Sequence, residues 1–118
     1  MAAIIIPSSL ETAQPTEVVR WAAEAFGADN LVVTASFEDA VLVHVAATAV
    51  PGIEITLLDT QYLFAETQWL VDELTKRLDL HLRIVRPSAE VVPDNRWQAD
   101  VEGCCQVRKV EPLARAIA

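Results

Sequence analysis

Short runs of β-branched and other apolar residues alternate along this chain with longer stretches of helical character. Strands are expected at 31–35, 53–58 and 80–85, and helices at about 16–26, 39–49 and 64–78. Strands that alternate with helices of roughly ten to fifteen residues are typical of a parallel sheet with right-handed crossovers. The pattern therefore predicts an α/β protein with three layers, in which a parallel sheet is flanked by helices.

Turn-forming and capping residues indicate where the helices begin and end. Thr16 is expected to cap the first helix and Gly27 to end it. The segment 87–102 contains two prolines and several acidic residues with weak periodicity, so it is expected to be a loop with at most a short helix. A last helix is expected to begin near Cys104 or Cys105.

The length of the chain allows one hydrophobic core. With 118 residues, of which 53% are hydrophobic, a second domain is not expected. No helix stop signal lies near Ala118. We therefore expect residues 1–118 to form a single α/β domain that is incomplete.

The acidic charge of the chain argues against nucleic acid as a partner. The formal net charge is −8, whereas proteins that bind a duplex present a cationic surface. Eight of the nine basic residues nevertheless lie at or beyond position 76. An anionic small ligand is therefore expected to be held from the C-terminal part of the chain, by Arg86, Arg108 and Lys109.

Neither a membrane span nor an export signal is expected. The longest apolar run, at 40–50, is interrupted by His44 and is too short to cross a bilayer. The isoleucines at 4–6 lack the preceding positive region of a secretory signal. Because the chain also has two neighbouring cysteines, a reducing cytoplasm is the expected compartment.

Polar residues follow each of the three expected strands. They are found at 36–39, at 59–60 and at Arg86. Because ligands of open parallel sheets bind beyond the carboxyl ends of the strands, we expect these stretches to converge. The first is a strand-to-helix turn whose amides would attract a phosphate or sulfate, with Ser36 as a further donor. An ordinary capped turn there, and an Asx turn at Asp59, are the alternatives.

The only two cysteines, Cys104 and Cys105, are adjacent and are followed by Arg108 and Lys109. Neighbouring cysteines make a poor disulfide because the ring is strained. A thiolate pair beside two cations is suited to a soft metal centre, whose negative charge the cations would offset. The alternative is a pair of buried thiols that fill space at the start of a helix.

Three stretches together resemble the phosphoadenosine phosphosulfate reductase family. Residues 104–113 have the pattern Cys-Cys-x-x-Arg-Lys-Val-x-Pro-Leu, which is similar to the segment with the first cysteine pair of assimilatory adenylyl-sulfate reductases. Residues 34–44 resemble the modified phosphate-binding loop of the family, and residues 57–67 resemble its Leu-Asp-Thr nucleotide motif. The three occur in the family's order, and the resemblance extends from about Val18 to the last residue.

The resemblance implies an adenine-nucleotide α-hydrolase-like fold, known as the PP-loop fold, in a nucleotide- and phosphosulfate-binding domain. It also implies reduction of adenylyl sulfate, or of its 3′-phosphorylated relative, to sulfite with thioredoxin as reductant. The cysteine pair favours adenylyl sulfate. The residues expected to face the substrate are Ser36, Phe37, Leu58, Asp59, Thr60, Arg86, Arg108 and Lys109, and association into a homo-oligomer is left open.

The resemblance further implies that Cys104 and Cys105 are two of the four ligands of a four-iron, four-sulfur cluster. The later Cys-x-x-Cys pair and the attacking cysteine of the family, in a Glu-Cys-Gly segment, do not occur in this chain, so we assign no catalytic residue and expect the chain alone to be inactive. Gln61 stands where many relatives have glycine. The competing hypotheses are a non-catalytic nucleotide-binding module or remnant, and an assembly module in which cysteines of two chains share one ion.

Overall fold

The computed structural model describes residues 4–118 and contains one parallel sheet with helices on both of its faces. Its strands are β1 (Val33–Thr34), β2 (Glu54–Leu58) and β3 (His81–Val85). The α-helices are α1 (Pro15–Phe26), α2 (Val41–Ala49), α3 (Ala65–Leu78), α4 (Val101–Cys105) and α5 (Glu111–Ile117). Short 3₁₀ turns lie at Ser8–Thr12, Ala28–Asn30 and Arg96–Gln98, and a π-helical turn at Gln106–Val110 joins α4 to α5.

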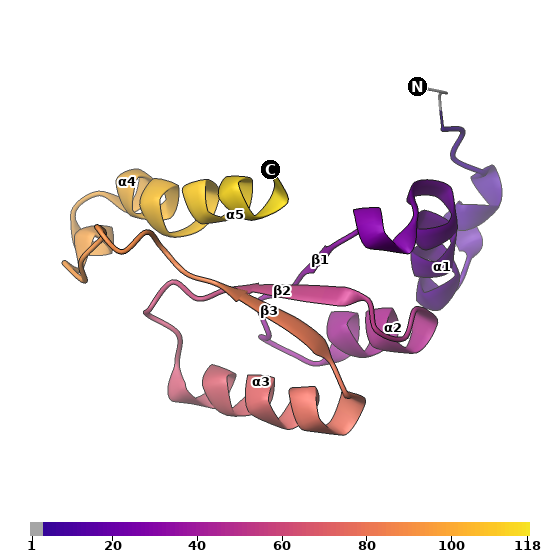
Figure 1. The fold of residues 1–118 in the computed structure, drawn as a ribbon, viewed down its shortest axis with the longest axis horizontal. Coiled ribbons are helices and arrows are strands. Elements are labelled where there is room, and N and C mark those ends of the chain that lie inside the picture. The colour runs from indigo at the N-terminus through magenta and orange to yellow at the C-terminus, as the bar shows by residue number, and fades with distance from the viewer. Residues whose placement is uncertain (1–3) are drawn as a thin grey trace.

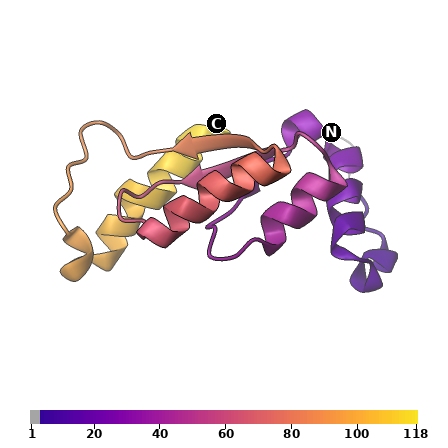
Figure 2. The same cartoon turned by 90° about the horizontal axis from the view of Figure 1, so that it is seen from below.

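The strands lie in the order β1-β2-β3, and both pairs are parallel. In this register Ile55 of β2 lies opposite Val33 on one side and Leu82 on the other. Figure 1 shows α2 and α3 on one face of the sheet, with α4 and α5 on the other, and Figure 2 shows the same layers from below. The predicted α/β class, with a parallel sheet between helical layers, is confirmed.

The core lies between β2 and the helices α2 and α3. Ile55 and Val43 are fully buried, and Val71 of α3 packs into the same cluster. Helices lie on both faces of the sheet, and the three middle residues of β2, Ile55, Thr56 and Leu57, are all buried. The edge strand β3 is mostly exposed along its length.

Two predicted helix starts are wrong. Helix α1 begins at Pro15 rather than after Thr16, because proline fits the first turn, where an amide has no partner in the helix. The last helix begins at Val101 rather than at the cysteines, because the side chain of Asp100 caps it by accepting a hydrogen bond of 3.0 Å from the Gly103 amide. The cysteines therefore lie at the end of α4.

The described part of the chain is more extended than a compact domain of this length. Its radius of gyration is 16.2 Å, whereas a compact domain of 100 residues has a radius of gyration of about 13 Å. Several large apolar side chains, including those of Phe64, Trp69 and Ile117, are exposed. Within residues 4–118 no helix has both the length and the apolar character needed to cross a membrane.

Candidate functional site

A cavity of about 660 Å³ lies at the carboxyl ends of β1 and β2. This is the position at which an open parallel sheet receives a ligand, because the loops after neighbouring strands diverge there. Its lining includes five of the eight predicted substrate-binding residues, namely Ser36, Phe37, Leu58, Thr60 and Lys109. The other three predicted residues, Asp59, Arg86 and Arg108, do not line it.

The turn after β1 forms one side of the cavity. Phe37 has a positive φ of 58° and is only 2% exposed, so its ring is part of the core as well as of the cavity lining. Ser36 beside it is exposed. Asp39 Oδ1 accepts a hydrogen bond of 2.9 Å from the Val41 amide, which forms an Asx turn just before α2. Glu38 and Asp39 both belong to the cavity lining, so two carboxyl groups lie beside it.

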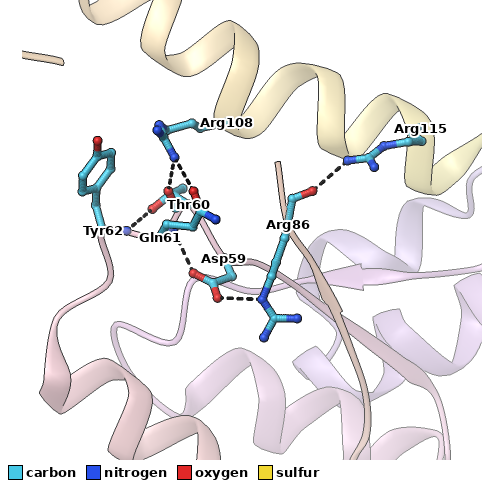
Figure 3. Close-up of polar contacts among 7 residues, drawn as sticks. All are labelled: Asp59, Thr60, Gln61, Tyr62, Arg86, Arg108 and Arg115. Carbon is cyan, nitrogen blue, oxygen red and sulfur yellow. Dashed lines mark hydrogen bonds and ion pairs between the residues drawn. The ribbon is translucent and has the colours of Figure 1, made fainter. Parts of the chain in front are cut away.

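The turn after β2 is held by its own side chains. Asp59 Oδ1 accepts a hydrogen bond of 2.8 Å from the Gln61 amide, which is the Asx turn of the alternative interpretation. The other carboxylate oxygen of Asp59 lies 3.2 Å from Nε of Arg86. Asp59 and Arg86 are therefore paired with each other (Figure 3). Thr60 lines the cavity, and its Oγ1 accepts a hydrogen bond of 3.3 Å from the Tyr62 amide.

The two adjacent cations of the cysteine segment are placed differently. Lys109 lines the cavity and is exposed. Arg108 is 2% exposed and donates hydrogen bonds to Thr60 O at 2.9 Å, to Gln61 Oε1 at 2.8 Å and to Val92 O at 2.9 Å. Figure 3 shows its guanidinium directed at the turn after β2. This placement does not favour a direct contact between Arg108 and a ligand.

A π-helical turn at Gln106–Val110 contains both cations. Pro112 follows it in the same helical stretch and has no N–H to donate to the carbonyl four residues earlier, that of Arg108. A regular α-helix is disfavoured at that point. Single π turns within helices are uncommon and are frequently found at functional sites.

The cysteines are free, with Cys104 buried and Cys105 half-buried. No group of three or more histidine, cysteine or acidic side chains that could hold a metal ion occurs within residues 4–118. The buried Nε of Arg108, four residues after Cys104, has no hydrogen-bond partner. Two thiols followed in the same helical stretch by two cations fit one side of a sulfur-rich, negatively charged group, but they are half of the four ligands that a cubane cluster needs.

The sequence did not single out Tyr62 as a site residue, yet it lies at the centre of the arrangement. The Cζ atom of the Arg108 guanidinium lies over the Tyr62 ring, 4.6 Å from the ring centroid. The Tyr62 hydroxyl accepts a hydrogen bond of 3.0 Å from the Asn95 amide. Tyr62 also lines the cavity. The available signal was its place just beyond a strand end, which is where the site forms.

The chain is similar to proteins of one known family. The phosphoadenosine phosphosulfate reductase domain matches residues 30–118, and the chain belongs to this family. It is 38% identical over 115 residues to adenosine 5′-phosphosulfate reductase of Streptomyces coelicolor, covering 92% of this chain and 48% of that protein. It is 37% identical over 123 residues to phosphoadenosine 5′-phosphosulfate reductase of a Synechocystis species, covering 95% and 49%. The chain thus spans about half the length of the curated relatives it matches.

The fold is also that of a solved reductase. The crystal structure of phosphoadenylyl-sulfate reductase from Candida auris, in a phosphate complex, aligns with a TM-score of 0.77 over 98% of this chain and 64% of that chain. The sequences are 22% identical in this alignment, so the similarity concerns the fold. The structural similarity supports the predicted PP-loop-like architecture.

Proposed function

We propose that this chain is the substrate-binding part of a cytoplasmic, thioredoxin-dependent reductase that converts adenylyl sulfate to sulfite and AMP. One observation supports the proposal most directly. The two predicted nucleotide motifs and Lys109 of the cysteine segment, which are far apart in the sequence, line the same cavity. The cavity lies where nucleotides bind in parallel α/β proteins.

The lining is suited to a nucleotide that has an anionic end. Apolar side chains of Leu42, Leu63 and Phe64 line it, and they offer surfaces for a base. Lys109 supplies the positive charge for a phosphosulfate group, and the amides of the 36–39 turn are expected to be further donors, which must offset the carboxyl groups of Glu38 and Asp39 in the same lining. Adenylyl sulfate is preferred here to its 3′-phosphorylated relative because the cysteine pair belongs to the cluster-containing relatives that the sequence resembles.

We further propose that Cys104 and Cys105 supply two thiolates to a four-iron, four-sulfur cluster, whose other two ligands come from outside this chain. When bound, such a cluster would place a compact group of negative sulfur atoms beside the positively charged side chains. Within the chain itself, Lys109 holds the sulfate end of the substrate. The nucleophile and the thioredoxin contact belong to parts of the protein that this chain does not contain.

The test is calorimetric titration of the chain with adenylyl sulfate and with AMP. We expect Lys109→Ala to weaken adenylyl sulfate about tenfold and AMP much less, because a charge-assisted contact to the sulfate oxygens is lost. Lys76→Ala is the matched control, since Lys76 is an exposed lysine of α3 that does not line the cavity. Equal losses for both ligands in Lys109→Ala would instead favour the alternative of a nucleotide-binding module without sulfate recognition.

A further inference from the structure

Arg108 is a buried cation without an acidic partner. It is the largest fully buried side chain of the described chain, and none of the ion pairs within residues 4–118 includes it. A buried charge is costly unless its surroundings compensate for it. The compensation at Arg108 comes from two main-chain carbonyls, one side-chain amide oxygen and the face of an aromatic ring.

These partners belong to segments that are distant in the sequence. Thr60 and Gln61 lie in the turn after β2, whereas Val92 lies in the loop after β3. The ring of Tyr62 extends the connection, because its hydroxyl accepts a hydrogen bond from the amide of Asn95 in that same loop. One arginine therefore connects the π-helical turn after α4 to two loops at once, one of which lines the cavity.

The turn that Arg108 contacts has an unfavourable backbone conformation. Gln61 has a φ of 71°, in the left-handed region that glycine adopts readily and other residues adopt at a cost in free energy. Arg108 binds the side chain of this residue and the carbonyl of the residue before it. The hydrogen bonds from Arg108 thus stabilise the strained position itself.

We propose that Arg108 is a positioning residue that holds the 59–62 turn in the conformation required by the cavity. Thr60 and Tyr62 line the cavity, and Arg108 does not. The inference deepens the proposed function and rests on it, since it takes the cavity to be the ligand site. Arg108 then affects affinity only through the turn, whereas its neighbour Lys109 acts on the ligand directly.

The first test compares two ligands in two backgrounds. Arg108→Ala is expected to weaken AMP and adenylyl sulfate by the same factor, roughly tenfold, because the lost hydrogen bonds are to the turn and not to the sulfate. Adding Gln61→Gly to Arg108→Ala is expected to restore part of the affinity for both ligands, since glycine adopts the positive φ without strain. Arg108→Lys, which keeps the charge and a donor, is expected to lose less than Arg108→Ala.

The contrary result is equally distinct. If Arg108→Ala weakens adenylyl sulfate more than AMP, and Gln61→Gly restores nothing, then Arg108 contacts the sulfate and the positioning role is wrong. Should Arg108→Ala fail to fold, Arg108→Lys with and without Gln61→Gly provides the same comparison.

The second test uses no ligand. NMR order parameters of the amides of Thr60, Gln61 and Tyr62 are expected to fall in Arg108→Lys, while those of Ile55 and Leu57 in β2 stay near the value of a rigid backbone, about 0.85. Unchanged values at the turn, or a uniform fall across the chain, would overturn the inference. If the unaltered chain binds neither ligand, the proposed function fails, and this measurement still decides the role of Arg108.

Discussion

Phe37 combines two properties that are rarely found in one residue. Its side chain is buried among the core residues, and its backbone has a positive φ of 58°. A bulky residue in the left-handed region is strained, and such residues cluster at ligand sites. The burial of the ring offsets the strain, because burying a phenylalanine side chain contributes about 1.5–3 kcal/mol, which is comparable to a backbone cost of about 1–3 kcal/mol.

This balance predicts an unusual order of stability for substitutions of Phe37. Phe37→Ala is expected to lower the free energy of unfolding by about 3–5 kcal/mol, through loss of apolar contacts and the remaining cavity. Phe37→Gly is expected to be at least as stable as Phe37→Ala, because glycine releases roughly 1 kcal/mol of backbone strain. Urea denaturation measures both values.

Val71 in the middle of α3 is the matched control for Phe37. It is buried in the same core, and its backbone is helical. Val71→Gly is expected to be less stable than Val71→Ala by about 1 kcal/mol, which is the usual order in a helix. The same order at position 37 would contradict the interpretation that Phe37 is strained.

At the level of elements, the start of α4 depends on a close contact between Asp100 and Gly103. The Asp100 carboxylate accepts a hydrogen bond from the Gly103 amide. A Cβ atom placed on Gly103 would collide with that carboxylate. The Asp100 cap and Gly103 therefore depend on each other, and together they determine where α4 begins.

The contact predicts that the effect of Gly103→Ala on stability depends on the residue at position 100. In the unaltered chain Gly103→Ala is expected to destabilise the protein or to leave it unchanged, because the cap is displaced. In an Asp100→Ala background, itself less stable by about 1 kcal/mol, Gly103→Ala is expected to stabilise the protein by up to about 1 kcal/mol. Thermal unfolding of the four proteins of this double-mutant cycle measures the coupling, and simple additivity would show that the two residues act independently.

At the scale of the whole molecule, the supply of thiol ligands limits what this chain can hold. The sequence contains two cysteines, and a cubane cluster needs four thiolates. If no other protein supplies ligands, two copies of this chain would have to share one cluster, or one ion, to provide four thiolates. The extended shape of the described chain and its exposed apolar side chains leave surface available for such an association.

Anaerobic reconstitution with iron and sulfide tests this limit. We expect at most about two iron atoms per chain, because one cluster requires the cysteines of two chains. Any cluster should then appear only in a dimer fraction on size exclusion. Cys105→Ser is expected to abolish it, and a stable content of four iron atoms per monomeric chain would contradict the assignment of Cys104 and Cys105 as two ligands of four.

The alternation of apolar runs and helices by itself determined the α/β class and the parallel sheet. It also determined the edge of the sheet at which the cavity lies, because the carboxyl ends of all strands in a parallel sheet lie at the same edge. The expected segment bounds differ from the observed ones mainly at the ends. For example, the run at 31–35 contains a strand of two residues, Val33–Thr34, since pairing with β2 rather than β-propensity sets its length.

Only the tertiary structure decided which charged residues reach the cavity. Arg108 and Lys109 are adjacent and both cationic, so no pattern of charge distinguishes them, yet one is buried beneath the turn and the other lines the cavity. Consecutive residues of a helix point in different directions, and which direction meets a partner depends on segments far away in the sequence. The sequence predicted that Asp59 and Arg86 lie at neighbouring strand ends, but only the tertiary structure showed that they pair with each other.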